Sequence, residues 1–299
     1  MIEYIPAKTI VTKTKDSGWF GMDYNMNIYK GCCHGCIYCD SRSDCYQIQD
    51  FDQVRAKENA LMIIRDDLRR KGKKGVVGTG AMSDPYNPFE KELNLTRHSL
   101  ELIDAFGFGA AIATKSPLLY RDVDILDSIR EHSPVLCKVT ITTIEDELAA
   151  KIEPGVPVSS RRLALISDLR DQNIFTGILL MPVLPFLEDQ EKNILGIVRA
   201  AHEVGARFIY AYFGMTLRDN QREWDYRKLE ELFPGRGLAA RYGKTYKNQY
   251  ECHSARAKKL WNCFTEECRK YGILYNMKDI VHAYKRGYEE AQQLSLFDL

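Results

Sequence analysis

Six short apolar runs alternate with stretches of helical spacing between residues 25 and 215, and this alternation constrains the fold more than any other feature of the chain. The runs are "MNIYKG" (26–31), "GVVGTGAM" (75–82), "GAAIATKS" (109–116), "VLCKVTITT" (135–143), "FTGILLMPVLP" (175–185) and "RFIYAYFGM" (207–215). Nearly continuous apolar strands separated by amphipathic helices are typical of buried parallel strands joined by right-handed crossovers. Six such units predict an α/β fold, a partial (β/α)6 barrel of the TIM type.

The pattern changes after residue 215. Helical spacing covers residues 221–232, 254–271 and 277–292, and the glycine-rich, basic segment "PGRGLAARYGKTYKN" separates the first two. The sequence therefore predicts a barrel core over residues 1–220 and a helical C-terminal extension over residues 221–292. The extension should pack on the barrel and could close one of its ends, and residues 293–299 form a tail.

Composition and the first residues predict the compartment. The chain has 299 residues, 45% hydrophobic and 28% charged, which suits a globular enzyme. The cysteine count is odd, nine, and "MIEYIPAKTIVTKTKD" has no apolar stretch long enough for a signal peptide or a membrane span. We expect a reducing, cytoplasmic location, where clustered cysteines are more often metal ligands or redox groups than disulfides. The net charge is +1, so nucleic-acid binding would need local basic patches.

The densest chemical feature is "YKGCCHGCIYCDSRS" (29–43), in which Cys32, Cys36 and Cys39 have the spacing C-x3-C-x2-C. These residues follow the first predicted strand and should lie at the end of the barrel where such enzymes place their chemistry. Three thiolates suit either a zinc ion completed by His34 or an iron–sulfur cluster that leaves one iron without a protein ligand. A complete zinc site would strain one short loop, and Cys33 fits the spacing less well.

This spacing after the first strand of a barrel is similar to the signature of the radical S-adenosylmethionine (radical SAM) superfamily. The resemblance implies that the three cysteines hold a four-iron four-sulfur cluster, whose open iron binds the amino and carboxylate groups of S-adenosylmethionine. It also implies cleavage of the cofactor to a 5′-deoxyadenosyl radical that abstracts hydrogen from a substrate. The electron would come from a donor such as flavodoxin or ferredoxin.

Four further segments resemble the spore photoproduct lyase-like branch of this superfamily. They are "GTGAMSDPYNPFEKELNLTR" (78–97), "ATKSPLLYRDVDIL" (113–126), "TITTIEDELAAKIEPGVP" (140–157) and "GILLMPVLPFLED" (177–189). The resemblance covers roughly residues 20 to 220. It implies a lyase-like enzyme that acts on nucleic acid, with repair of DNA lesions as the specific activity.

The resemblance assigns several residues to a cofactor pocket. Gly78, Thr79 and Gly80 follow the second strand, where members of the family receive the methionyl amino group, and a missing side chain allows close backbone approach. Ser83 and Asp84 match a Ser-Asp pair of the cofactor or substrate pocket. Either residue could instead cap the turn before the following proline.

Two more positions complete this pocket. Lys115 matches a lysine near the cofactor carboxylate, where a cation suits a partly dry pocket; the alternative is a surface lysine. Thr142 and Thr143 end the fourth predicted strand, where the superfamily places a hydroxyl for the ribose. We assign this role to Thr142.

The match departs from the lyase at the residues that handle hydrogen. Tyr38 matches one tyrosine of the family's relay, whereas Asp40 replaces the other tyrosine and Ala81 stands where a hydrogen-donating cysteine is expected. A carboxylate cannot pass on a hydrogen atom as a phenol can. Cys252 or Cys45 could supply a thiol, although free cysteines are usually small buried hydrophobes.

Two segments predict partners. Residues 240–259 interleave three tyrosines with six cations, which favours either a nucleic-acid surface or a solvated helix and loop with the tyrosines turned inward. "QLSLF", Gln293 to Phe297, resembles the pentapeptide by which bacterial replication and repair proteins bind the sliding clamp. The alternative is a tail folded on its own core.

Three hypotheses about function follow. The first is a DNA-lesion lyase or related repair enzyme. The second is a radical SAM enzyme acting on RNA, a peptide or a small molecule, which Ala81 and Asp40 favour. The third is a zinc-binding, non-enzymatic module associated with replication.

Overall fold

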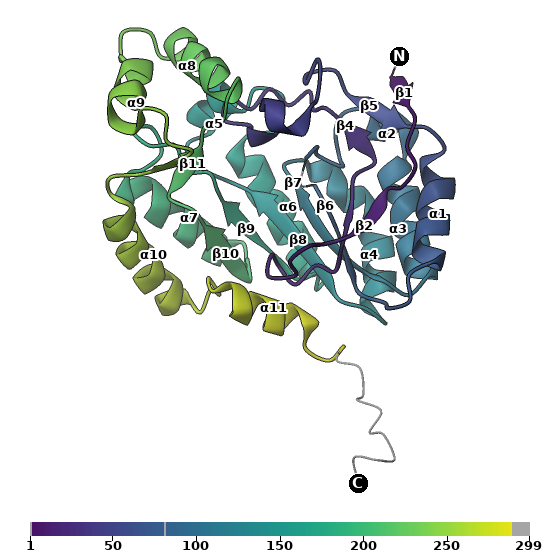
Figure 1. Cartoon of the computed structure of the whole chain (residues 1–299). Helices are drawn as coiled ribbons and strands as arrows, with labels where there is room; N and C mark the ends of the chain where they lie inside the picture. The colour runs from purple at the N-terminus through teal and green to yellow at the C-terminus, as the bar shows by residue number, and fades with distance from the viewer. Residues whose placement is uncertain (1, 81, 289–299) are drawn as a thin grey trace, which may run out of the picture.

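The computed structural model describes residues 2–80 and 82–288. Its main sheet has seven strands in the order β10-β9-β8-β7-β6-β3-β2, and helices cover its outer side (Figure 1). Along the chain these strands are β2 (Val11–Lys13), β3 (Tyr24–Met26), β6 (Val76–Thr79), β7 (Gly109–Thr114), β8 (Val135–Thr140), β9 (Thr176–Leu180) and β10 (Phe208–Ala211).

Six neighbouring strands of this sheet follow one another in chain order. Each pair from β3 through β6, β7, β8 and β9 to β10 is parallel, and only β2 runs antiparallel at the edge. In the described part of the chain no ladder joins β10 back to β2 or β3, so the barrel is open on one side. The predicted partial (β/α)6 barrel is confirmed.

The segment predicted as the first strand, residues 26–31, is divided between two strands that belong to different sheets. Met26 ends β3, whereas Tyr29 and Lys30 form β4, which pairs with β5 (Arg55–Lys57) in a small sheet of order β1-β5-β4 that also contains β1 (Glu3–Ile5). The apolar run is continuous because both strands are buried, and periodicity alone cannot show that the chain leaves the barrel between them.

Helices connect the parallel strands and continue into the C-terminal extension. They are α1 (Ala60–Arg69), α2 (Glu90–Leu93), α3 (Leu95–Ala105), α4 (Val123–Arg130), α5 (Asp146–Ile152), α6 (Ser159–Asp171), α7 (Glu191–Glu203), α8 (Gln221–Leu232), α9 (Leu238–Tyr246), α10 (Ala257–Tyr271) and α11 (Met277–Lys285). The helix α8 has the predicted bounds. The helix α11 ends earlier than predicted, and the last residues of that prediction lie outside the described residues.

The helix α9 and the strand β12 (Glu251–His253) lie in segments for which the sequence predicted no such elements. The predicted strand at residues 207–215 contains β10 and the first two residues of β11 (Gly214–Thr216), which pairs with β12 in a hairpin. In α9, Leu238, Tyr242 and Tyr246 are spaced four residues apart and are all buried, so one face of the helix packs on the protein. Its glycines and basic residues hide this pattern in the sequence.

The two faces of the barrel wall bury different side chains. On β8, Val135, Cys137 and Val139 point outward into the apolar layer beneath the surrounding helices, whereas Leu136 points into the barrel. Successive side chains of a strand point to opposite faces, so Lys138 also points inward. The barrel interior is therefore a packed core that contains one lysine.

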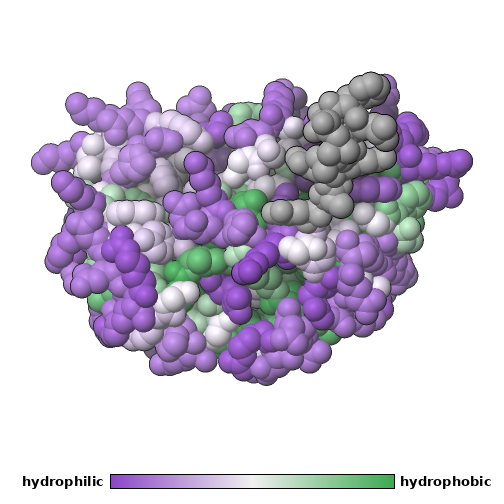
Figure 2. Space-filling view, turned by 90° about the horizontal axis from the view of Figure 1, so that it is seen from below, coloured by the Kyte–Doolittle hydropathy of each residue, from purple (hydrophilic) through white to green (hydrophobic). Residues whose placement is uncertain are grey.

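The helix α11 covers the end of the barrel opposite α8 and α9 (Figure 1). Ile280 and Tyr284 of this helix pack with Phe20 and Met22 inside the barrel, and the Tyr284 hydroxyl donates a hydrogen bond to the Phe20 carbonyl at 2.7 Å. Figure 2 shows this end from below, with apolar side chains near its centre and hydrophilic ones around them. None of the helices described here is long and apolar enough to cross a lipid bilayer.

Lys138 is buried in the barrel without an acidic partner. Its side chain is only 2% exposed; its Nζ lies 3.5 Å from the Met22 sulfur and 4.8 Å from the Phe20 ring centroid. Among the described residues no carboxylate forms an ion pair with it. Burial lowers the pKa of Lys138 to about 7 because an ammonium loses its hydration there.

Replacing Lys138 with methionine is expected to stabilise the protein by about 1–4 kcal/mol at pH 7, because the variant buries no ammonium. The folded-state pKa is depressed, so the unfolded chain binds more protons above pH 7 and wild-type stability rises with pH from about 7 towards 10. The advantage of the variant should therefore be largest below pH 7. Urea unfolding from pH 6 to 10 measures it. A less stable variant, or a pH-independent difference, would contradict this account.

Candidate active site

The cysteine-rich loop lies between β4 and a short 3-10 helix, η1 (Asp40–Arg42). Cys32 and Cys36 are buried, Cys39 is partly buried, and all three are free thiols. Burial raises the pKa of Cys36, neighbouring Lys115 lowers it, and negative charge on Cys39 or Cys32 raises it further. The three thiols therefore lie close enough together to interact electrostatically.

Neighbouring segments hold the start of the loop in place. The Cys32 amide donates to the Phe51 carbonyl at 2.8 Å, and the Ser83 hydroxyl donates to the Gly31 carbonyl at 2.6 Å. Gly31 has a φ of +81°, and a Cβ there would lie 2.4 Å from a backbone oxygen. Ser83, which the sequence placed in a cofactor or substrate pocket, thus anchors the cysteine loop.

The end of α5 supports the middle of the loop. The Gly155 amide donates to the His34 carbonyl at 2.8 Å, and the Ile37 amide donates to the Ile152 carbonyl at 3.0 Å. A Cβ at residue 155 would lie 2.6 Å from the His34 oxygen, so only glycine allows this approach.

The environment of the thiols suits a bound cation. Burial raises the pKa of Cys32 to about 12 and also raises that of Cys39. Without a metal the thiols therefore stay protonated at neutral pH, and iron would supply the charge that stabilises the thiolates. Within the described residues no three His, Cys, Asp or Glu side chains are arranged round one metal ion. In a four-iron cluster each thiolate binds a different iron, so its ligands lie farther apart.

A buried ion pair adjoins the loop. The Tyr38 hydroxyl donates to Glu153 Oε1, and the Arg162 guanidinium donates to Oε2 of the same carboxylate. Arg162 also donates to the Thr140 carbonyl at 2.8 Å and to the Pro157 carbonyl at 2.6 Å. Tyr38, Glu153 and Arg162 are 6%, 1% and 0% exposed, respectively. The pair is thus shielded from water and fixed by further hydrogen bonds.

Lys115 points towards this group. Its Nζ lies 5.7 Å from the centroid of the Tyr38 ring. Burial alone lowers the pKa of Lys115, but negative charge on Cys36, Glu153 and Asp84 outweighs this effect, and the pKa is raised. Lys115 is half-buried and is a cation beside the thiols, and its contact with the cofactor carboxylate stays a prediction.

Asp84 acts as a local structural acceptor. Its carboxylate accepts hydrogen bonds from the Thr114 hydroxyl at 2.7 Å, the Lys115 amide at 2.8 Å and the Tyr86 amide at 2.9 Å, and lies 3.7 Å from His34 Nδ1. The bond to Tyr86 is the turn cap that the sequence left as an alternative. Asp84 thus fixes the end of β7 beside the cysteine loop.

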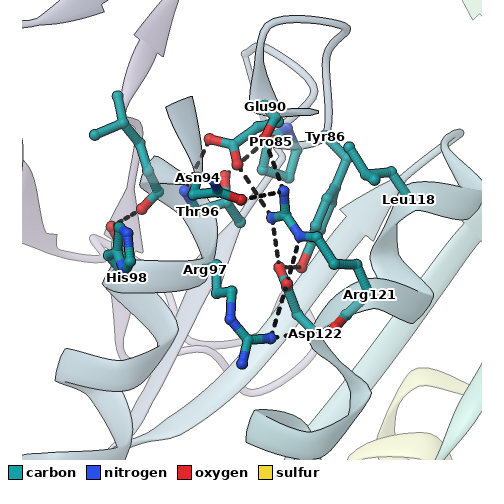
Figure 3. Close-up of polar contacts among 12 residues, drawn as sticks. Pro85, Tyr86, Glu90, Asn94, Thr96, Arg97, His98, Leu118, Arg121 and Asp122 are labelled. Atoms are coloured by element: carbon teal, nitrogen blue, oxygen red, sulfur yellow. Dashed lines mark hydrogen bonds and ion pairs between the residues drawn. The ribbon is translucent and has the colours of Figure 1, made fainter. Parts of the chain in front are cut away.

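A second buried network joins the loops that follow β6 and β7 (Figure 3). Arg121 donates to the Glu90 carbonyl at 2.7 Å, to Asn94 Oδ1 at 2.8 Å and to the carboxylate of Asp122 at 2.7 Å and 2.9 Å, and the Tyr86 hydroxyl donates to Asp122 at 3.0 Å. Glu90 and Asp122 are fully buried. This network orients the loop after β6, from which Ser83 and Asp84 contact the cysteine loop, and the loop after β7, which begins with Lys115.

The predicted glycine turn has packing reasons of its own. A Cβ at Gly78 would lie 2.1 Å from the Met22 sulfur, and one at Gly80, whose φ is +92°, would lie 2.0 Å from the Ala113 oxygen. By strand alternation Thr79 points to the outer face. The structure explains both glycines without a ligand, and their contact with a cofactor stays a prediction.

The two threonines at the end of β8 differ in their hydrogen bonds. The Thr143 hydroxyl accepts from the Glu145 amide at 3.1 Å, whereas Thr142 Oγ1 is buried without a partner in the described structure. Beside it Glu188 accepts from the Leu184 amide at 2.8 Å through Oε2, and its Oε1 also has no partner. Burial raises the pKa of Glu188 to about 8. The two side chains adjoin each other, and the Thr142 hydroxyl lowers the pKa of Glu188 against the effect of burial; a contact of Thr142 with a ribose stays a prediction.

In the described part of the chain the Cys252 thiol forms no hydrogen bond with the other predicted site residues. Cys252 is fully buried in β12, opposite Met215 of β11, and its thiol donates to the Gln249 carbonyl at 3.7 Å. Burial raises its pKa to about 11, and the nearest charges are Arg222 and Asp225 of α8.

Asp40 connects the cysteine loop to the C-terminal region. It accepts hydrogen bonds from the Tyr46 hydroxyl at 2.8 Å, the Thr216 hydroxyl at 2.9 Å and Arg218 Nε at 3.1 Å. The guanidinium of Arg218 also lies 3.5 Å from the Cys45 sulfur. Where the relay of the lyase would have a second tyrosine, this chain has an anchoring carboxylate.

The basic, tyrosine-rich segment at residues 240–259 has some of its tyrosines in the core and one at the surface. Tyr242 and Tyr246 are buried, and their hydroxyls donate to the carbonyls of Pro185 and His253 at 2.8 Å each. Tyr250 is 43% exposed. The alternative with inward tyrosines is therefore correct for two of the three. Ala81 and the Gln293–Phe297 peptide lie outside the described residues.

Reasoning from the sequence missed three residues of this site. Glu153, Arg162 and Glu188 received no role, although Glu153 and Glu188 lie in two of the segments that resemble the lyase family. The carboxylate of Glu188 within an apolar segment is a usable signal, whereas Glu153 lies in a segment with four other charged residues. Arg162 lies on α6 among other polar residues and carries no comparable signal.

A barrel of parallel strands with three thiols in the loop after its first strand defines the class of radical-generating β/α-barrel enzymes. The model of the Radical SAM superfamily matches residues 26–197. The uncharacterized protein Mb2609c of Mycobacterium bovis is 31% identical over 251 residues, which cover 81% of this chain and 72% of that protein. The uncharacterized protein MJ0683 of Methanocaldococcus jannaschii is 33% identical over 190 residues, 62% of this chain and 69% of that protein. The chain belongs to the radical SAM superfamily.

Solved structures share the fold. A mutant of spore photoproduct lyase superposes with a TM-score of 0.67 at 13% identity, covering 91% of this chain and 81% of that one. Spore photoproduct lyase complexed with dinucleoside spore photoproduct gives 0.64 at 14% identity, covering 90% and 80%. The protein is therefore a radical SAM enzyme with the fold of that lyase. The family's cofactors are a four-iron four-sulfur cluster and S-adenosylmethionine.

Proposed function

We propose that this radical SAM enzyme abstracts hydrogen from a nucleic-acid substrate, with DNA-lesion repair resembling that of spore photoproduct lyase as the specific activity. The observation that carries the cofactor assignment is the set of three neighbouring free thiols, Cys32, Cys36 and Cys39, beside the cation of Lys115. These cysteines would hold the cluster. Together the cluster and S-adenosylmethionine supply reductive cleavage of the cofactor and a hydrogen-abstracting species.

The residues of the chain would bind and orient the cofactor. Lys115, whose Nζ lies 5.7 Å from the Tyr38 ring centroid, would meet the cofactor carboxylate, and Thr142, beside Glu188, would bind a ribose hydroxyl. The glycine turn at Gly78 to Gly80, with Ser83 and Asp84, would border the cofactor while holding the loops round it.

Tyr38 is the proposed hydrogen relay. Its hydroxyl is bonded to Glu153, so the proton it releases on oxidation has an acceptor within hydrogen-bond reach. Arg162 stabilises the anionic form of that acceptor. Cys252 stays a second candidate hydrogen donor in place of the missing thiol at residue 81, and it would need a rearrangement of β12 to reach a substrate.

The nucleic-acid substrate is supported by the fold shared with a lyase solved in complex with dinucleoside spore photoproduct, and by the exposed Tyr250 ring beside Arg218. We further propose docking of Gln293–Phe297 on a sliding clamp and reduction by a flavodoxin or ferredoxin. A substrate other than DNA is the second candidate, because Ala81 and Asp40 replace the hydrogen-handling residues of the lyase.

The test is anaerobic. Reduced, reconstituted protein is given S-adenosylmethionine with DNA that carries the spore-type thymine dimer, and 5′-deoxyadenosine and repaired thymines are quantified. We expect repair by the wild type and loss of repair, with 5′-deoxyadenosine still formed, in a Tyr38→Phe variant. If 5′-deoxyadenosine forms and the lesion survives, the proposed substrate is wrong and the second candidate gains support.

A further inference from the structure

A hollow of about 650 Å³ lies on the outer side of the cysteine loop, between residues 42–55 and the start of α8. Four cations line it, Lys30, Arg42, Arg55 and Arg227, together with three carboxylates. One of these carboxylates, Asp44, already accepts a hydrogen bond at 3.0 Å. The hollow has no role in binding the cluster or S-adenosylmethionine as assigned above.

Arg42 forms the rigid floor of this hollow. Its guanidinium lies 3.7 Å from the Trp224 ring centroid and 4.7 Å from that of Phe51. Both terminal nitrogens donate to Asp52, at 2.9 Å and 2.5 Å, and the side chain is only 8% exposed. Stacking between two rings and a bidentate ion pair hold the cation in one orientation.

Three N–H donors of the lining have no acceptor in the described structure. They are Arg42 Nε, Arg55 Nε and Trp224 Nε1, each buried and each from a different element. No oxygen of the lining is unpaired in this way. Buried donors without partners are costly, and an excess of donors indicates a ligand rich in acceptors.

We infer that this hollow binds a backbone phosphate of a single-stranded nucleic acid, an inference that rests on the proposed function and extends it. A phosphate offers several acceptor oxygens and a negative charge to arginine and tryptophan N–H groups. The cations of Lys30, Arg55 and Arg227 are therefore complementary to it, and a phosphate that reached the three buried donors would also satisfy them.

A polymer fits better than a free phosphate compound because the hollow continues. A second hollow of about 290 Å³ shares Asp44 with the first and is lined by Arg218, Arg222 and Tyr250. The Tyr250 ring is 43% exposed and has the Arg218 guanidinium 4.4 Å from its centroid. A strand could place successive phosphates on the arginines and stack a base on the tyrosine.

The hollow also adjoins the cysteine loop. Lys30 and Arg42 border that loop on either side, and Phe51 accepts the hydrogen bond from the Cys32 amide at 2.8 Å. A strand bound here would therefore approach the mouth of the barrel, where the proposed chemistry takes place.

The experiment measures binding of a fluorescein-labelled single-stranded oligothymidylate by anisotropy over a range of salt concentrations. Arg55→Gln removes a cation and a donor, whereas Trp224→Phe removes the N–H and keeps an aromatic ring for Arg42. Matched controls are Arg65→Gln, whose side chain is 54% exposed on α1, and Trp261→Phe, 42% exposed on α10.

We expect Arg55→Gln to weaken binding about tenfold and to reduce the slope of log K against log salt by about 0.7, the value for one phosphate contact on a single strand. Trp224→Phe should weaken binding about three- to tenfold without changing the slope, because it removes a hydrogen bond and no charge. The control variants should bind as the wild type does.

Other outcomes overturn the inference. If the wild type repairs or binds nucleic acid but Arg55→Gln and Trp224→Phe behave as their controls do, the assignment of the hollow is wrong and the proposed function stands. If the wild type neither binds the strand nor acts on lesion DNA, the proposed substrate itself fails. If inorganic pyrophosphate binds as tightly as the strand and Arg55→Gln weakens both equally, the site is one for free phosphates. If Arg55→Gln and Trp224→Phe bind the strand normally but are no longer reduced by flavodoxin, the hollow is a surface for the redox partner.

Discussion

A Cys36→Ala variant is expected to purify colourless after anaerobic reconstitution and to form 5′-deoxyadenosine only at the level of a protein-free control. Cys36 is buried between Cys32 and Cys39, and the loop that carries it is held by α5 and by the segment before β5. When one of the three thiolates is removed, only two protein ligands remain, and two ligands cannot hold the cluster. Iron and sulfide content, visible absorbance and product formation measure the effect.

Cys33→Ala is the matched control for this experiment. Cys33 lies in the same loop and is partly buried, yet its side chain packs against the apolar layer outside the barrel. We expect this variant to keep the cluster and the product. A colourless Cys33→Ala protein, or a Cys36→Ala protein that still binds four irons, would show that the ligand set is different from the one proposed.

An Arg162→Met variant is expected to lose about 3–5 kcal/mol of unfolding free energy. Arg162 is fully buried and pairs with the carboxylate of Glu153, which is 1% exposed. Without the guanidinium this carboxylate must remain in a dry site with only the Tyr38 hydroxyl as partner, or take up a proton. Denaturant unfolding of the cluster-free protein measures the loss.

Two further variants separate this cause from a general effect on α6. Arg170→Met removes an exposed arginine of the same helix, whose partner is the adjacent Asp171, and should change stability little. Glu153→Gln combined with Arg162→Met removes both charges and should be more stable than Arg162→Met alone. If the double variant is the least stable of the set, the uncompensated charge is not the cause.

The barrel was predictable because its strands carry their signal locally. A strand buried on both faces is mostly apolar, and "VLCKVTITT" contains all of β8 with Lys138 as its exception, just as α8 has the bounds that its spacing predicts. The same locality produced the errors. The run at residues 26–31 reads as one strand although it belongs to two sheets, and the apolar face of α9 lies among glycines and cations in the sequence.

The site was predictable only where a motif concentrates it. Cys32, Cys36 and Cys39 lie within one loop, and Lys115 directly follows β7 at the same end of the barrel. Glu153 meets a tyrosine 115 positions away in the sequence, and no periodicity links the two.

The strands of the barrel and the loop of three thiols were readable from the chain, because each carries its pattern within a short segment. Folding brought together groups that are distant in the chain: the Glu153–Arg162 pair beside Tyr38, the buried neighbours Thr142 and Glu188, and the hollow lined by Arg42, Arg55 and Trp224. Contacts between distant segments set burial and charge at a site, and these quantities exist only once the chain has folded.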